Sequence, residues 1–356
     1  MTTPRPRCRQ PRGHDRDIWD RGIWDRHTRG RSRALCSLCW IVLCLAGACS
    51  SVDRCFGAEP ATTLVDLAVS DLAAPANGQV VYAIDERQRT IVAFEPHATV
   101  RQRLAVAAAP ESGPRPVAVA CIDTTTLVAV CVAGESWSLR SWRLKPDAPA
   151  DPAQPLQTLG LGSAPVSTGD VHVAVNGSRT WLAVIGLPEP LPPVLRGPIA
   201  GNRVGKCSDR GCPRLDAAER PVALAITAAD ELVLVCRPGP EAQERLSFHD
   251  LAGRRLLHLD LELPAVHDMA FNRGDGTLLA VGGTPDSPTH PEGVWRLDAA
   301  IRDGRQVVSA VRIAECPSPR AVLCPTEKTI VVASGQGGGR VLRFQPAPPE
   351  GTQEKP

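Results

Sequence analysis

Residues 115–120 read Arg-Pro-Val-Ala-Val-Ala, and residues 127–131 follow with Leu-Val-Ala-Val-Cys. The same pair returns at 220–225 as Arg-Pro-Val-Ala-Leu-Ala and at 232–236 as Leu-Val-Leu-Val-Cys. Each half is a short apolar run of the kind that forms a β-strand, and a short polar turn joins the two halves. A strand pair that recurs at long range indicates an array of small, similar sheets.

Further copies of this strand pair occur along the chain when Ala120 is taken as the reference position. The equivalent positions are Ala68, Ala120, Ala174, Ala225, Ala270 and Leu323, with spacings of 52, 54, 51, 45 and 53 residues. A third strand, often of alternating polarity, follows five of the six pairs, and several copies continue into a fourth apolar run. Each repeat therefore predicts a sheet of about four short strands with Gly, Asn and Asp at its turns.

Ring closure explains why such sheets occur as an array. A lone four-stranded sheet cannot bury both of its faces, whereas sheets around one axis pack on their neighbours and leave only short edges. The sequence therefore predicts an all-β fold, a six-bladed β-propeller over residues 61–346. A seventh blade has room in the Pro- and Gly-rich insert at 187–219. A β-sandwich is the alternative, but it gives no reason for a fifty-residue period.

The repeat resembles those of NHL-type and lactonase-like β-propellers, which share Pro-x-Ala followed by an apolar residue, a polar turn and a Val-rich strand. The resemblance covers about residues 61 to 346. Lactonase-like propellers hold a divalent cation in the central channel with Glu, Asn and Asp, so the resemblance implies such a site. No matching Glu-Asn-Asp set stands at the equivalent positions of this chain.

The N-terminal segment has the features of an export signal. Ten Arg and four Asp within residues 1–33 precede a 15-residue apolar run at 34–48. That run is too short for a comfortable membrane span and suits a signal peptide, which predicts a leader over 1–48 with cleavage after 48 or 58. Residues 49–60 are then a linker, and 347–356 a disordered tail. We expect a periplasmic or extracellular protein with no membrane span in the mature chain; lipid anchoring at Cys49 is an alternative.

Charge and motifs exclude several function classes. The formal net charge is +2, and the basic excess lies in the leader, so the folded domain is not expected to bind nucleic acid. The loop at 200–207 (Ala-Gly-Asn-Arg-Val-Gly-Lys-Cys) lacks the Ser or Thr and the helix of a phosphate-binding loop. No nucleophile elbow or His-Glu-x-x-His motif is present. The sequence therefore identifies no catalytic residue, metal ligand or cofactor.

Two pairs of cysteines are candidates for disulfides in an exported protein. Cys207 and Cys212 lie close together in the insert, and Cys316 and Cys324 flank a Pro-containing segment that is predicted to be a turn. Cys121, Cys131 and Cys236 fall in predicted buried strands, where a small apolar side chain is the simpler interpretation.

The residues that lead into each innermost strand are the candidate ligand contacts, because they ring one mouth of a propeller channel. Their mixed charges could hold a polar ligand. They are Asp66, Arg115, Asp170, His172, Arg220, His267, Asp268 and Arg320. We first expect a binding or scaffolding module for a protein or cell-envelope component; the alternative is a metal-dependent lactonase-like hydrolase at the channel mouth.

Overall fold

The computed structural model describes residues 62–96, 103–145, 148–166, 171–239, 242–335 and 338–345. These residues form β-strands and turns and contain no α-helix, which confirms the predicted all-β class. Within the same ranges there is no long apolar helix of the kind that crosses a membrane. The predicted leader, linker and tail, and with them Cys49, lie outside the described residues.

The strands follow one another in antiparallel groups of four, here called blades 1 to 6 in chain order. Blade 1 contains β2 (Val69–Ala73), β3 (Val81–Asp85), β4 (Thr90–Phe94) and β5 (Arg103–Val106). Blade 2 contains β6 (Arg115–Cys121), β7 (Thr126–Ala133), β8 (Ser136–Arg143) and β9 (Gln157–Ser163). Blade 3 contains β10 (His172–Val175), β11 (Trp181–Ile185), β12 (Val194–Ala200) and β13 (Arg203–Val204).

The C-terminal half continues the pattern. Blade 4 contains β14 (Arg220–Ile226), β15 (Leu232–Arg237), β16 (Arg245–His249) and β17 (Arg255–Leu261). Blade 5 contains β18 (Asp268–Phe271), β19 (Leu278–Gly282), β20 (Gly293–Arg302) and β21 (Arg305–Glu315). Blade 6 contains β22 (Pro319–Thr326), β23 (Thr329–Ser334), β24 (Arg340–Phe344) and, from the start of the described chain, β1 (Thr62–Val65). Blades 4 and 5 are joined into one eight-stranded sheet by parallel pairing of β17 with β21.

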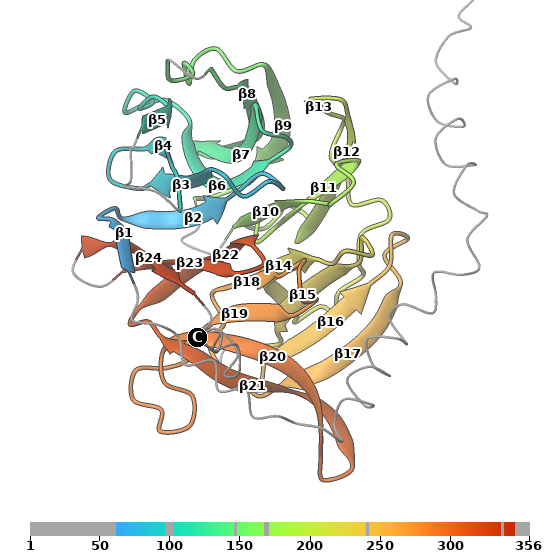
Figure 1. Ribbon diagram of the computed structural model, residues 1–356. Helices are drawn as coiled ribbons and strands as arrows, with labels where there is room; N and C mark the ends of the chain where they lie inside the picture. Colours follow the sequence, from blue (N-terminus) through green and yellow to red (C-terminus); the bar gives the residue numbers. More distant parts are fainter. Residues whose placement is uncertain are drawn as a thin grey trace, which may run out of the picture. The chain divides into compact units, whose positions relative to one another are not determined.

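The innermost strands close a ring. Each of β2, β6, β10, β14 and β18 contacts the innermost strand of the following blade, and β22 contacts β2. The blades accordingly succeed one another around a common centre in Figure 1. Pairing of β1 with β24 joins the two ends of the described chain in blade 6. These contacts confirm the predicted propeller arrangement.

Burial follows from this geometry. The second strand of each blade is covered on both faces, and β3, β11 and β19 are buried along their whole length. Apolar clusters fill the space between neighbouring blades; Tyr82 and Trp142, for example, belong to the cluster between blades 1 and 2. Propellers use this shared packing to bury sheets that could not fold alone.

The structure corrects the first repeat. Residues 65–68 were predicted as the first innermost strand, but Val65 ends β1 (62–65) at the outer edge of blade 6, and 66–68 lie in no strand. The innermost strand of blade 1 is β2, so its reference alanine is Ala73 and not Ala68. A bulge between Val69 and Leu72 interrupts the pairing there and obscures the repeat.

The segment at 187–219 also differs from the expected insert. It carries β12 and β13, which pair beside β11 and complete blade 3. Its Gly and Pro residues concealed these strands. Pro198 lies in β12 opposite Trp181, and Gly197 lets Cys207 approach the strand closely.

Candidate functional site

One position of the repeat, two residues before the reference residue, alternates between polar and apolar around the ring. It is polar in blades 1, 3 and 5 and alanine in blades 2, 4 and 6, and every one of these side chains is buried. The polar residues are Asp71, His172 and Asp268; the alanines are Ala118, Ala223 and Ala321. Three innermost strands therefore direct an ionisable side chain toward the same level of the channel.

The polar residues converge. Asp71, His172 and Asp268, here called the channel triad, each offer one ligand atom, and these three atoms lie within 4.8 Å of one another. Nδ1 of His172 is 3.4 Å from Oδ1 of Asp268. Each of the three residues is more than nine-tenths buried. The triad therefore brings two carboxylates and an imidazole together away from bulk water.

Backbone amides orient the two carboxylates in the same way. Asp71 accepts hydrogen bonds from the amides of Leu72 (2.9 Å) and Val119 (2.7 Å). Asp268 accepts hydrogen bonds from Met269 (2.8 Å) and Val322 (2.8 Å). In both cases one donor lies in the aspartate's own strand and the other in the next blade. Each carboxylate thus links two blades while it faces the channel.

His172 occupies the third such position without this pair of bonds. Its Nε2 is buried and has no hydrogen-bond partner among the described residues. The amides of Val173 and Leu224 occupy the positions equivalent to those of the amides that bind the two aspartates. The amides of Asn176 and Thr227 donate hydrogen bonds toward β11 and β15. Because the direction of the amide groups alternates along a strand, the amides of Val173 and Leu224 point toward the channel. Donor groups therefore gather on the His172 side of the channel.

The electrostatics of the triad are set by two buried carboxyl groups that lie close together. Burial raises the pKa of Asp71 well above its usual range, and the nearby charge of Asp268 raises it further. The amides of Val119 and Leu72 act in the opposite direction. Two carboxylates this close and this buried favour a shared positive charge, whether a proton or a cation.

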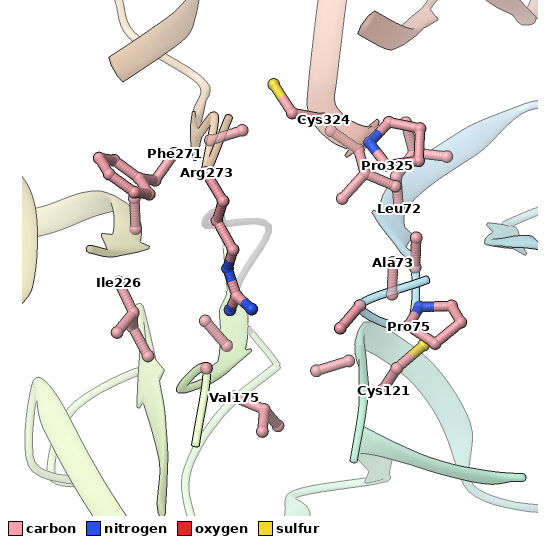
Figure 2. Close-up of a pocket in the computed structure, with 18 of the residues that line it drawn as sticks. Leu72, Ala73, Pro75, Cys121, Val175, Ile226, Phe271, Arg273, Cys324 and Pro325 are labelled. Atoms are coloured by element: carbon pink, nitrogen blue, oxygen red, sulfur yellow. The ribbon is translucent and has the colours of Figure 1, made fainter. Parts of the chain in front are cut away.

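A cavity of about 350 Å³ contains the triad and extends toward the turns that follow the innermost strands. Its wall includes Pro75, Val175, Arg273 and Pro325, which Figure 2 shows around the opening. The cavity lies on the side where the innermost strands end. The mouth predicted from the sequence is at the opposite side, where these strands begin.

The predicted contact residues are therefore only partly assembled. His172 and Asp268 belong to the triad, whereas His267 is half-buried and is not a triad member. Four others are exposed, and two of these form surface ion pairs, Asp66 with Arg340 (4.0 Å) and Arg220 with Glu189 (3.8 Å). The exposed residues are Asp66, Arg115, Arg220 and Arg320. Asp170 lies outside the described residues.

Asp71 is the member of the triad that the sequence analysis missed. Asp66 is predicted as a contact because it leads into the strand around Ala68, the misplaced reference position. With the reference position at Ala73, Asp71 stands two residues before it, as His172 and Asp268 do before their reference alanines. The register of β2 against β3 was thus the missing information.

The predicted disulfides do not form, because all four cysteines are free thiols. Cys207 packs against the cluster between blades 2 and 3, and Cys212 against that between blades 3 and 4. The segment between Cys316 and Cys324 is not a turn. Strand β22 runs through it, and at about 3.3 Å per residue it carries Cys324 far from Cys316.

Sequence comparison gives no assignment. No protein-family model matches the chain, and no curated protein matches it.

Solved structures do resemble it in fold. A gluconolactonase from Xanthomonas campestris (XC5397) superposes with a TM-score of 0.52 at 15% identity and covers 81% of this chain and 89% of that one. A PQQ-bound aldose sugar dehydrogenase from Streptomyces coelicolor has a TM-score of 0.50 at 12% identity and covers 80% and 98%. Hydrazine synthase from Kuenenia stuttgartiensis has a TM-score of 0.50 at 13% identity and covers 76% and 75%. This chain is thus similar in fold to lactonase-like β-propellers.

Proposed function

We propose that this protein is an exported, metal-dependent hydrolase that holds a divalent cation at the channel triad. The observation that carries the proposal is the convergence of Asp71, His172 and Asp268, whose ligand atoms lie within 4.8 Å of one another. The buried, unpartnered Nε2 of His172 adds a second observation. Buried polar atoms without a partner are uncommon in folded proteins, so Nε2 marks a place for a ligand atom, while Nδ1 of the same ring lies beside Asp268.

The donor set suits a particular class of metal. Imidazole nitrogen favours Zn²⁺ and related transition metals, while carboxylate oxygen also suits Mn²⁺. Three protein ligands leave positions for a water molecule or a substrate oxygen, as in catalytic sites. The triad differs from the Glu-Asn-Asp set that the lactonase-like resemblance implies, so the cation preference is argued from these three residues alone.

The protein supplies orientation and a place for substrate. The amides that bind Asp71 and Asp268 hold the carboxylates toward the channel, as hydrogen bonds to the ligating side chains do in metal sites. The cavity beside the triad, about 350 Å³, accommodates a small molecule. A bound divalent cation would supply Lewis-acid polarisation of a carbonyl oxygen, which is the chemistry of ester or lactone hydrolysis. The likeness in fold to a gluconolactonase supports this reaction class.

This function fits the channel better than the binding or scaffolding role that the sequence suggested first. Burial of two carboxylates and a histidine at one point costs free energy unless they are paired or ligate a metal. A scaffold has no need of such a group on its axis. A metal site explains why three alternate blades carry ionisable residues where the others carry alanine.

Metal binding tests the proposal directly. We expect the purified full-length protein to bind one Zn²⁺ or Mn²⁺, measured by calorimetry and metal analysis. Asp268→Asn and His172→Ala should each weaken binding by about 100-fold, because one of the three ligands is lost. Asp66→Asn, at an exposed position, is the matched control and should bind as the wild type does.

Hydrolysis of a panel of lactones and esters by the metal-loaded protein, lost in Asp268→Asn, would support the reaction class. A wild-type protein that binds no cation and copurifies with a partner would instead favour the scaffold.

A further inference from the structure

Arg273 reaches across the cavity opening. It lies in the turn between β18 and β19, and its guanidinium group rests on Gly177 in the turn between β10 and β11. A Cβ atom at Gly177 would lie 3.3 Å from Nη1 of Arg273. Figure 2 shows the side chain directed into the open space of the pocket, away from the turn that carries it. Glycine at 177 therefore leaves room for the guanidinium group to lie close to the backbone.

The turn that carries Arg273 is fixed on the neighbouring blade. Buried Asn272 donates from Nδ2 to the carbonyl oxygen of Glu327 (3.2 Å) and accepts from the amide of Gly274 (3.1 Å). The aliphatic part of Glu327 lies directly over Gly274. Because both sides of the turn are held, the backbone presents Arg273 to the channel in a defined direction.

The guanidinium group of Arg273 has no anionic partner within the described part of the protein. Among the residues that the structure describes, Arg273 forms no ion pair, although it lines the same cavity as Asp71 and Asp268. Both aspartates accept hydrogen bonds from backbone amides instead. Arg179, from the turn that contains Gly177, also lines the opening. The opening thus presents two guanidinium groups, together with the side chain of Glu327, to whatever enters.

Deeper in the cavity the wall offers further donors. The amides of Val173 and Leu224 face the channel beside His172, where no carboxylate accepts them, as strand alternation requires. Backbone amides arranged in this way favour a negatively charged oxygen. Donor groups therefore occur at two levels, at the opening and beside the triad.

We propose that Arg273 binds a carboxylate of the ligand, so that the substrate class of this channel is a small molecule bearing a carboxylate group. The planar guanidinium group binds carboxylates with two parallel hydrogen bonds, which gives both affinity and orientation. The inference deepens the proposed function by naming its substrate class. Anion binding at Arg273 nevertheless does not itself require the cation.

A pair of probes separates charge from shape. Tartrate and threitol share a four-carbon polyol skeleton, and only tartrate carries carboxylates. Calorimetric titration of the full-length protein, metal-free and Zn²⁺-loaded, should show binding of tartrate and much weaker binding of threitol. Arg273→Ala should reduce tartrate affinity by about 10-fold or more, and Arg273→Lys should restore part of it, since the charge remains but the fork is lost.

The controls make each failure distinct. Arg115→Ala removes an exposed arginine at the other end of an innermost strand and should leave tartrate binding unchanged. Zn²⁺ affinity should be the same in Arg273→Ala and in the wild type. Equal tartrate affinity in Arg273→Ala, Arg115→Ala and the wild type would overturn the inference even if Zn²⁺ binds. Tartrate binding that depends on Arg273 in a protein that binds neither Zn²⁺ nor Mn²⁺ would sustain it and reject the metal site.

Discussion

The carboxylate of Asp71 accepts a 2.7 Å hydrogen bond from the amide of Val119, which belongs to the next blade. Asp268 repeats this bond with Val322, from blade 5 to blade 6. A residue that faces the channel therefore also joins neighbouring sheets. Changes at these aspartates should affect both the site and the stability of the ring, and the two effects can be separated by the choice of substitution.

Asp71→Asn should retain much of the stability, because the amide oxygen of asparagine can still accept the Val119 hydrogen bond. Asp71→Leu leaves the amides of Val119 and Leu72 buried without an acceptor, and it should lower the free energy of unfolding by about 2–4 kcal/mol relative to Asp71→Asn. Urea denaturation of the metal-free proteins measures the difference. Asp66→Leu, at an exposed position, should change stability by less than about 0.5 kcal/mol. Equal stability of the two Asp71 variants would contradict the role of the bond.

Gly78 and Gly201 form a matched pair for the packing of the turns around the cavity. Both have a φ of +62°, but a Cβ at Gly78 would lie 2.1 Å from the carbonyl oxygen of Pro325, whereas one at Gly201 meets nothing within 4 Å. Gly201→Ala should cost about 1 kcal/mol, the backbone penalty alone. Gly78→Ala should cost clearly more, measured by thermal and urea unfolding. A cost of Gly78→Ala no larger than that of Gly201→Ala would show that the turn at Gly78 can move away from the turn at Pro325.

His249 should make stability depend on pH. It is fully buried, its Nε2 lies 2.9 Å from Oγ of Ser247, and burial together with the charge of Arg255 lowers its pKa to about 4. The unfolded chain has a histidine pKa of about 6.5, so the unfolded state takes up the proton first as pH falls. The stabilisation is complete above pH 6.5 and is lost progressively toward pH 4, by about 2 kcal/mol at pH 5.

His249→Gln removes this titration and can keep a hydrogen bond to Ser247. The difference in unfolding free energy between pH 7 and pH 5 should therefore be smaller in this variant than in the wild type by about 2 kcal/mol. His290→Gln, at a half-buried position beside Trp295, is the control and should preserve the wild-type difference. An unchanged pH dependence in His249→Gln would mean that other groups set it.

Strand β1 should be essential for ring closure. Residues 62–65 pair with β24, and Val65 is part of the cluster between blades 6 and 1. A variant without residues 62–65 exposes the edge of β24 and opens that cluster. We expect a lower unfolding temperature and faster proteolysis of blade 6 than of blade 3, read from the fragments by mass spectrometry. Uniform proteolysis of all blades would contradict this expectation.

The repeat predicts the ring because each strand pair keeps the same spacing of small apolar residues, as in 115–131 and 220–236. Once the repeats are aligned, His172 and Asp268 occupy the same position, two residues before their reference alanines. The ring is then enough to put both residues at the channel. It fails for Asp71 because the repeat has no landmark inside β2, where a bulge shifts the pairing. Bulges are set by contacts between strands, which a single sequence does not display.

The predicted disulfides and the predicted insert fail for a different reason. Cysteines close in sequence were expected to pair, but Cys207 and Cys212 face different clusters because the bridge of Ser208 with Arg196 and the turn at 209–211 separate them. In the same segment Gly197 and Pro198 look like breakers, yet they lie in β12, at a position where Cys207 needs a residue without a side chain. Turn-forming residues inside strands are explained only by what packs on them.

Pairing of β1 with β24 sets an order of events for a newly made chain. Residues 62–65 leave the ribosome before any blade exists, yet their hydrogen-bonding partner is residues 341–343, which are made after blades 1 to 5. Strand β1 therefore remains unpaired while every other blade is synthesised. Protection from aggregation during that interval is a requirement that the architecture itself imposes on the cell.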